Sequence, residues 1–297
     1  MNSVDFDYIA NVLKQRSGLA LTPDKAYLIE TRLSPIATKA KIASVEEMIR
    51  GLRQGKYANL LADITSAMTT NESSFFRDVR PFDTFRTEIL PRLLERRDAT
   101  RPIRIWCAAA STGQEPYTLA MILNEEKALV GNRRIEIIGT DIAPEVLARA
   151  KSGIYTHFEV QRGLPARLLI KYFDKVDDQW QIKPGLRAMV QYKEYNLLND
   201  LRPLGRFDII FCRNVLIYFD QPTKAKVLAA MNGVIADDGV LFLGGAETVL
   251  GISEKFKLME GQRGVYGPVL GASATSTRTV APAPAQPIRT AISALSG

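Results

Sequence analysis

The hydrophobic pattern of the first part of the chain is helical. Ala26, Ile29, Leu33 and Ile36 recur three or four residues apart, which places them on one face of a helix. The segment TPD at residues 22–24 supplies the hydroxyl, the proline and the acid that are typical of a helix start. A helix is therefore predicted to begin near residue 23.

Two further helices are predicted before residue 70. The segment SVEE at residues 44–47 has the spacing of a capping box, and Gly51 or Gly55 could end the helix that it opens. Residues 60–68 form a third helical segment. We expect residues 1–70 to be a small all-helical domain, and residues 71–100 to be a linker and helix that lead into the next domain.

From about residue 101, short apolar runs alternate with helical segments. The runs are IRIW, IEIIGTD, FDIIFC and GVLFLGG, and helical segments such as EPYTLAMILNEEKAL, PEVLARAKSG and PTKAKVLAAMNGVI lie between them. Buried parallel strands joined by crossover helices have this rhythm. We expect residues 101–268 to form an α/β domain with a doubly wound, mostly parallel sheet.

The rhythm lapses between residues 153 and 196. The strand-like segments QWQIK and AMVQYKEY flank Pro184-Gly185, which predicts a small antiparallel β-subdomain at about residues 156–192. After residue 267 the composition falls to mostly Ala, Ser, Thr and Pro without an aromatic side chain. Residues 269–297 are therefore predicted to be a disordered tail.

Composition and charge change this picture little. Hydrophobic residues make up 46% of the 297 positions, yet no run approaches the roughly 20 apolar residues that span a bilayer. The N-terminal segment MNSVDFDYIANVLKQR lacks the basic and apolar parts of a signal peptide, so a cytoplasmic protein is expected. The net charge of +7 fits a nucleic acid, an anionic membrane or an acidic protein surface equally well.

Residue types for nucleophilic or metal chemistry are scarce. Cys107 and Cys212 are the only cysteines and lack the spacing of metal ligands, so no metal site is expected. We interpret both as small buried hydrophobic residues rather than as a redox switch. His157 is the only histidine, and the segment GIYTHFEV around it offers no catalytic partner. A structural or surface role is expected for it.

The segment RIWCAAASTGQEPYTLAMI at residues 104–122 has the layout of a nucleotide-binding turn. A strand runs into a loop of small residues and then into a helix, but neither G-x-G-x-x-G nor a Walker lysine is present. The loop contains no basic residue, and Glu115 at its end would repel phosphate. A ligand that is cationic or rich in hydroxyl groups is favoured instead.

Asp141 ends the second apolar run, a position from which an acid commonly binds the ribose hydroxyls of an adenosine. Taken alone, Asp141 could equally be an N-cap, and Glu115 could be an acid that complements a helix dipole. Together, and without phosphate-binding residues, they indicate an adenosine that carries a positive group. S-adenosylmethionine has this chemistry.

Five segments in order carry a specific resemblance. They are MTTNESSFFRD (68–78), WCAAASTGQEPYTLAM (106–121), GTDIAPEVLARAKSGIY (139–155), NLL (196–198) and FDIIFCRNVLIYFD (207–220). Residues 1–268 resemble the chemotaxis receptor methyltransferase family, CheR. The resemblance implies a helical domain followed by an S-adenosylmethionine domain that carries a β-subdomain. It also implies methylation of glutamate side chains on the cytoplasmic helices of chemoreceptors, with S-adenosylhomocysteine as the product.

The resemblance also assigns site residues. Arg77 and Tyr218 are the expected catalytic residues, with Tyr218 on the substrate side. Ser73 stands where other members often have threonine, and it keeps the hydroxyl. The implied partner is the cytoplasmic domain of chemoreceptors, and a monomer that binds no nucleic acid and does not insert into the membrane is expected. The implied cofactor contacts are Asn71, Ser73, Arg77, Glu115, Asp141, Asn196, Leu197, Arg213 and Asn214.

Glutamate esterification needs little acid–base machinery. A glutamate carboxylate is already ionised at neutral pH, since its reference pKa is about 4.3. It can attack the sulfonium methyl group directly, so the task is alignment in a dry site, in which Arg77 would hold the cofactor or orient the carboxylate.

Two other functions are left open. A nucleic-acid methyltransferase that acts on base amino groups usually carries an N/D-P-P-Y loop after the fourth strand, where this chain has CRNVLIYF. A non-catalytic S-adenosylmethionine-binding signalling module would keep the cofactor residues without turnover.

Substrate docking is expected on the N-terminal helices. Lys25, Arg32 and Lys39 recur every seven residues and would form a basic stripe for acidic receptor helices, unless Pro35 breaks the helix or the stripe is only a solvated face.

The β-subdomain bears on substrate recruitment. Some members of the family use it to bind a receptor C-terminal pentapeptide as an added strand, through a longer, glycine-rich loop. Here residues 174–179 are short, acidic and free of glycine, so we expect no such tether.

Overall fold

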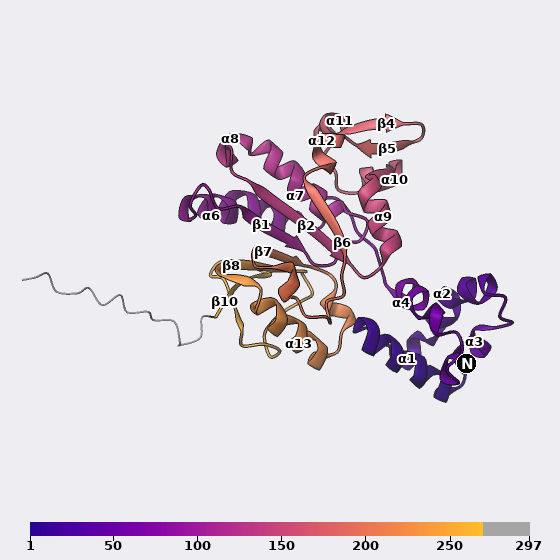
Figure 1. The fold of residues 1–297 in the computed structure, drawn as a ribbon. Coiled ribbons are helices and arrows are strands. Elements are labelled where there is room, and N and C mark those ends of the chain that lie inside the picture. The colour runs from indigo at the N-terminus through magenta and orange to yellow at the C-terminus, as the bar shows by residue number, and fades with distance from the viewer. Residues whose placement is uncertain (270–297) are drawn as a thin grey trace, which may run out of the picture.

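The computed structural model describes residues 1–269, so all but the first residue of the predicted tail at 269–297 lies outside the described part (Figure 1). The N-terminal part is all helical, as predicted. Its helices bury one core, to which Ile9, Leu33 and Ile49 contribute fully buried side chains. The helices are α1 (Ser3–Ser17), α2 (Ala26–Lys39), α3 (Val45–Arg53) and α4 (Leu61–Met68), with 3₁₀ turns η1 (Pro23–Lys25) and η2 (Ala58–Leu60).

Local signals explain where these helices begin and end. The predicted start near residue 23 is the 3₁₀ turn η1, and α2 follows directly. The Ser44 hydroxyl caps α3 by accepting the Glu47 N–H at 3.1 Å. Gly51 does not end α3 but lies inside it, where its missing side chain makes room for the Tyr57 ring. The helix continues to Arg53.

The predicted α/β domain is confirmed. Its central sheet has the strand order β6-β2-β1-β7-β8-β10-β9, in which the first five strands are parallel and β10 runs antiparallel to both of its neighbours, β8 and β9. The strand order reverses between β1 and β7, as in a doubly wound fold. The strands are β1 (Ile103–Cys107), β2 (Ile135–Asp141), β6 (Val190–Glu194), β7 (Phe207–Cys212), β8 (Ile235–Leu243), β9 (Phe256–Leu258) and β10 (Val265–Pro268).

Helices cover both faces of this sheet (Figure 1). One face packs on α6 and α7, and the other packs on α13. A helix interrupted by a π-helical turn leads from the linker into β1, and short helical turns complete the connections. The elements are α5 (Arg80–Thr84), the π turn η3 (Phe85–Ile89), α6 (Leu90–Arg96), α7 (Gln114–Glu125), α8 (Lys127–Val130), α9 (Pro144–Ser152), η4 (Arg202–Leu204), η5 (Leu216–Tyr218) and α13 (Gln221–Asn232).

The two cysteines are buried hydrophobic residues, as interpreted from the sequence. Cys107 lies opposite Phe211 in the β1–β7 register and packs into the core on one face of the sheet, whereas Cys212 packs into the core on the other face. They are therefore not placed to form a disulfide. Burial raises the pKa of both thiols well above its usual value, so both are unreactive.

The β-subdomain is antiparallel, as expected, but its composition differs from the prediction. Its strand order is β3-β5-β4, and the segment AMVQYKEY contributes none of the three strands. That segment instead forms β6, which pairs in parallel with β2 at the edge of the main sheet. Pro184-Gly185 opens a short helix, not a hairpin turn. The elements are β3 (Ile154–Thr156), α10 (His157–Gln161), α11 (Ala166–Tyr172), β4 (Phe173–Val176), β5 (Gln179–Ile182) and α12 (Pro184–Arg187).

One acid joins the subdomain to the catalytic domain. Glu125, in the last turn of α7, accepts hydrogen bonds from the Lys171 ammonium and the Tyr172 hydroxyl, both at 2.6 Å, and from the Arg167 guanidinium at 2.5 Å. All three donors belong to α11. The bonds to Lys171, Tyr172 and Arg167 lower the pKa of the Glu125 carboxyl to about 2.

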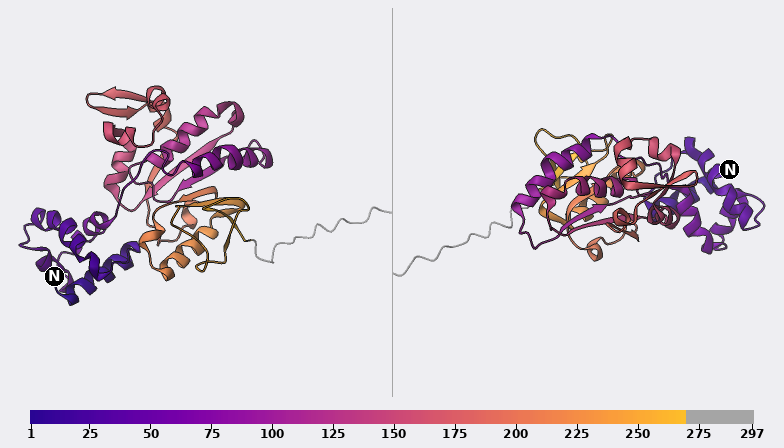
Figure 2. Two further views of the ribbon diagram at one scale, coloured as in Figure 1. Left: turned by 180° about the vertical axis from the view of Figure 1, so that it is seen from behind. Right: turned by 90° about the horizontal axis from the view of Figure 1, so that it is seen from above.

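The N-terminal helices lie at one end of the molecule (Figure 2). The segment after α1 meets the segment after β7, where Leu19 and Phe219 form an isolated antiparallel bridge. Beside it, the Lys14 ammonium pairs with Asp220 at 2.6 Å. A second contact joins the N-terminal helices to the catalytic domain, where the Ser66 hydroxyl of α4 donates to Glu145 at the start of α9.

Residues 1–269 contain no helix that is long and apolar enough to cross a membrane. Over the same residues, no group of three or more His, Cys, Asp or Glu side chains is arranged to hold a metal ion.

Glu125→Gln is expected to lower the melting temperature by a few °C at neutral pH, because largely exposed ion pairs contribute about 1 kcal/mol or less. The Glu125 pKa is depressed, so this stability is present above the ordinary value of 4.5 and is lost as the pH falls through about 2. Melting curves between pH 7 and pH 3 should show the gap to wild type closing on acidification. Glu126→Gln serves as the neighbouring control. A difference in melting temperature that is independent of pH would contradict a stabilising role for the ionised Glu125 carboxylate.

Candidate functional site

One pocket lies at the carboxyl ends of β1, β2 and β7, where the strand order reverses. In doubly wound folds this is where ligands bind. The ten residues predicted as cofactor contacts or catalytic residues all line this one pocket, although they come from five separate segments. They are Asn71, Ser73, Arg77, Glu115, Asp141, Asn196, Leu197, Arg213, Asn214 and Tyr218.

The loop after β1 is shaped by a tight backbone turn. Ser111 has φ of 49° and Gly113 has φ of 95°, both in the left-handed region. The Ser111 N–H donates to Asp141 Oδ2 at 2.9 Å, and the Ser111 hydroxyl donates to the Asn71 carbonyl at 2.7 Å. In a phosphate-binding turn such an N–H would face the anion, whereas here it holds a carboxylate.

Asp141 accepts two backbone amides, but it is not the N-cap that its sequence position suggested, because the N-cap of α9 is Ala143. Its Oδ1 accepts the Ala143 N–H at 3.1 Å at the start of α9, while its Oδ2 accepts the Ser111 N–H. A carboxylate offers about four acceptor sites, so two remain for hydroxyl groups in the pocket. Burial raises the pKa of Asp141, against the lowering effect of the Ala143 and Ser111 amides.

A buried arginine is shared between two acids at the base of the pocket. Arg213 Nη1 donates to Glu115 Oε2 at 2.8 Å, and Nη2 donates at 2.8 Å both to Asp78 Oδ2 and to the Arg77 carbonyl. The Arg213 side chain is only 2% exposed. Burial raises the pKa of Glu115, and the positive charge of Arg213 opposes that shift.

This distribution of charge fits S-adenosylmethionine better than a nucleotide phosphate. Arg213 is already paired with carboxylates, and the residues that line the pocket include no lysine. Asp141 keeps acceptor sites for ribose hydroxyl groups, and the acidic wall favours a cation such as the sulfonium.

The linker segment crosses the pocket in a strained conformation. Phe76, Asp78 and Val79 all have positive φ, with values of 50°, 68° and 48°. Non-glycine residues persist in this region only where the surroundings hold them, and they concentrate at functional sites. Here the Phe76 N–H donates to the Thr118 hydroxyl of α7 at 3.1 Å. Arg77 is half-buried, and its Nη1 donates to the Glu72 carbonyl at 2.9 Å.

Asn196 and Leu197 close the pocket on the β6 side. The Asn196 amide nitrogen donates to the Arg16 carbonyl at the end of α1, and its Oδ1 accepts the Leu198 N–H at 3.0 Å. The side chain predicted as a cofactor contact thus also ties the pocket to the N-terminal domain.

Residues from the N-terminal domain line the pocket, and the sequence analysis missed them. Ser17 and Leu19 lie against the pocket, next to Tyr218 and Phe219. The Ala20 N–H donates to the Tyr218 carbonyl at 2.9 Å. Two segments about 200 residues apart meet here. The one local sequence signal near this contact is Gly18, which ends α1 with φ of 81°.

The three predicted docking residues lie outside this pocket and differ from one another. Lys25 and Lys39 are exposed. The Arg32 guanidinium instead binds the end of α4 and the linker, donating to the Met68 carbonyl at 2.7 Å, the Thr69 carbonyl at 2.9 Å and the Thr70 hydroxyl at 3.0 Å. Its donors are thus turned toward residues 68–70, which directly precede Asn71 of the pocket.

Both domains match the same protein family. Residues 4–69 match "CheR methyltransferase, all-alpha domain", and residues 71–265 match "CheR methyltransferase, SAM binding domain". The junction between the two matches falls at the linker that carries Asn71.

Relatives match over nearly the whole chain. The chain is 33% identical over 267 residues to "Chemotaxis protein methyltransferase Cher2" of Pseudomonas putida, covering 89% of this chain and 97% of the relative. It is 37% identical over 260 residues to "Chemotaxis protein methyltransferase 1" of Vibrio cholerae, covering 85% of this chain and 92% of the relative. Since both domains and their order agree with a pocket suited to S-adenosylmethionine, the chain belongs to the CheR methyltransferase family and uses S-adenosylmethionine as its cofactor.

Proposed function

We propose that the protein methylates glutamate side chains on the cytoplasmic helices of chemoreceptors, giving glutamate methyl esters. One observation carries this choice of acceptor: the residues that line the pocket include no histidine and no lysine. His157, the only histidine, is exposed on the β-subdomain, where it pairs with Gln161 and Trp180. An acceptor that is already ionised needs no base, and a carboxylate satisfies that condition.

The residues of the pocket have separate roles in this proposal. The cofactor supplies a methyl group on a positively charged sulfur. Asp141 holds the ribose hydroxyl groups, and Asn71, Ser73, Glu115, Asn196, Leu197, Arg213 and Asn214 form the rest of the cofactor site.

The acceptor side is formed by Arg77 and Tyr218. Arg77 has donors beyond its bond to the Glu72 carbonyl, so it can orient an incoming carboxylate. Leu19, Val215 and Phe219 supply apolar walls that exclude water.

Docking of the receptor is proposed to use the exposed lysines of the N-terminal domain. Lys25 and Lys39 lie at the two ends of α2 and suit the acidic surface of a helix that presents glutamates. Arg32 is left out of this contact surface, because its guanidinium is bonded to the linker.

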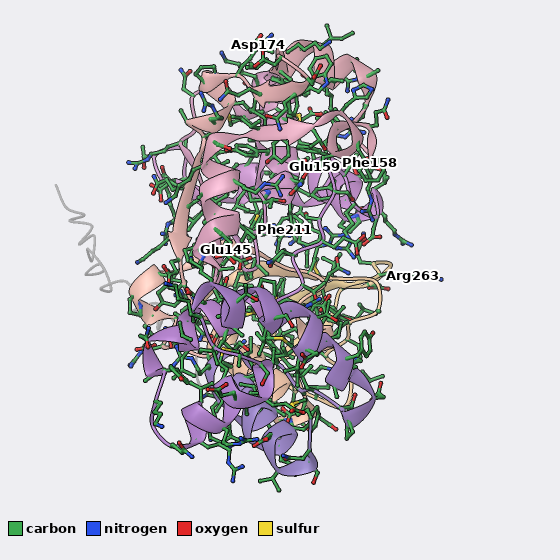
Figure 3. All side chains as sticks on the ribbon, turned by 90° about the vertical axis from the view of Figure 1, so that its right-hand side faces the viewer. Glu145, Phe158, Glu159, Asp174, Phe211 and Arg263 are labelled. Carbon is green, nitrogen blue, oxygen red and sulfur yellow. The ribbon has the colours of Figure 1, made fainter. Side chains whose placement is uncertain are left out.

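We further propose that the enzyme works without a receptor C-terminal tether. The outer edge of β4 is one place where a peptide strand could add, since β4 and β3 are the two end strands of the three-stranded sheet. The turn beyond it is formed by Asp177 and Asp178, and Asp174 lies on β4 itself. Three acids would repel a C-terminal carboxylate. Figure 3 shows Asp174 at the end of the molecule opposite the N-terminal helices.

Incubation with methyl-labelled S-adenosylmethionine and receptor cytoplasmic domains should give base-labile methanol, the signature of a carboxyl ester. Arg77→Ala should slow this reaction by about a hundredfold with an unchanged circular dichroism spectrum, because orientation of the reactants is lost. Arg86→Ala, in the following helix, is the control. Label on nucleic acid alone would indicate a nucleic-acid methyltransferase, and cofactor binding without turnover would indicate a signalling module.

Arg32 and Lys25 should be separable by their effects. Arg32→Ala should weaken S-adenosylhomocysteine binding by about three- to tenfold without receptor present, because the linker loses several hydrogen bonds. Lys25→Ala should leave that affinity unchanged and raise the receptor KM at low salt. Calorimetry and initial rates measure the two quantities. If Arg32→Ala keeps its cofactor affinity but raises the receptor KM, Arg32 belongs to the docking surface after all.

C-terminal pentapeptides from chemoreceptors should not bind measurably at concentrations up to about 100 μM. Titration calorimetry tests this directly, and full-length receptors should be methylated no faster than receptors that lack the last five residues. Low-micromolar binding, or a clear preference for the intact tail, would overturn tether independence.

A further inference from the structure

A buried carboxylate outside the pocket holds the loop that carries Arg213, Asn214 and Tyr218. Glu247 follows β8, is 8% exposed, and is not among the residues that line the pocket. No basic side chain pairs with it among the ion pairs of residues 1–269. Its partners are backbone amides instead.

Each oxygen of Glu247 accepts two backbone N–H groups. Oε2 accepts Asn214 N–H at 2.8 Å and Gly244 N–H at 2.7 Å. Oε1 accepts Val215 N–H at 2.9 Å and Ile217 N–H at 3.2 Å. Three of the four donors lie in the single loop between β7 and α13. Without the carboxylate these amides would lose their protein partner, which is most costly at Gly244, where the bond is buried; the other three bonds are partly buried.

Gly244 makes room for this arrangement. A Cβ atom at residue 244 would lie 2.7 Å from Glu247 Oε2 and 2.9 Å from the Asn214 nitrogen. The backbone of Gly244 is not in the left-handed region, so the lack of room for a Cβ atom, and not an unusual φ, is what requires glycine here. The next residue, Gly245, faces open space.

The loop needs such support because it begins with an unfavourable conformation. Asn214 has φ of 59°, and its N–H is one of the four donors to Glu247. On the far side, the loop is held by the Ala20 N–H bond to the Tyr218 carbonyl. The loop is therefore fixed between the turn after β8 and the segment after α1.

We propose that Glu247 is a positioning residue for methyl transfer, which acts by fixing the loop that presents Tyr218 to the acceptor. Its loss would leave Asp141 in place on another strand and Arg213 held by Glu115 and Asp78, whereas the amides from Asn214 to Ile217 would lose their acceptor. Turnover should therefore fall more than cofactor affinity. The turnover measurement rests on the proposed function, whereas amide exchange and cofactor binding do not.

Two pairs of variants test this. Glu247→Gln keeps the size of the side chain but replaces one acceptor oxygen by a donor, and Glu254→Gln is the exposed control. Gly244→Ala pushes against the carboxylate, and Gly245→Ala is its control. In both test variants the amides of Asn214, Val215 and Ile217 should exchange hydrogen about tenfold faster. Turnover should fall about tenfold, while the Kd for S-adenosylhomocysteine changes less than about threefold.

The outcomes separate a positioning role from a general loss of stability. Unchanged exchange at the three amides, turnover within twofold of wild type, or equal losses in the control variants would overturn the proposal. If Glu247→Gln does not fold, Gly244→Ala against Gly245→Ala decides the question. If the wild-type protein esterifies no receptor, the proposed function fails, while exchange and cofactor binding still show whether Glu247 fixes the loop.

Discussion

The site depends first on one buried guanidinium. Arg213 connects the loop after β7 to the start of α7 through Glu115, and to the linker through Asp78 and the Arg77 carbonyl. Its charge is balanced only while both acids stay in place, and an unpaired buried charge is strongly unfavourable. The Phe82 ring covers the guanidinium, with its centroid 5.2 Å away. Three segments that are far apart in the sequence are thereby held around one pocket.

This arrangement determines which kind of ligand the pocket complements. The Arg213 guanidinium is paired with Glu115 and Asp78, and the Ser111 amide is bonded to Asp141. The rest of the pocket presents acceptor atoms, apolar walls and the Arg77 guanidinium, which keeps donors beyond its bond to the Glu72 carbonyl. A ligand with hydroxyl groups and a positive centre complements such a surface, and an anionic nucleotide does not.

Sequence patterns predicted the parts of the fold that are locally determined. The strands β1, β2 and β7 are buried on both faces, so they stand out as short apolar runs. The strand β6 is at the edge and alternates, so its pattern fits a parallel edge strand and an antiparallel hairpin equally well. The motif residues were placed by resemblance to a family. The roles of Leu19 and Glu247 were missed, because their partners lie far away in the sequence. Arg32 was assigned to a receptor contact, because helical periodicity shows which residues share one face of a helix but not what packs on that face.

The junction at Gly18 limits how the N-terminal domain can be exchanged between relatives. Gly18 ends α1 with φ of 81°, and a Cβ atom there would lie 2.9 Å from the Phe219 ring. The ring in turn belongs to the segment that bridges to Leu19. A chimera that joins the helical domain of one homologue to the catalytic domain of another therefore has to carry residues 17–20 and 216–220 from the same parent. The two domains match two separate models of the family, but in this chain they share one interface at the pocket.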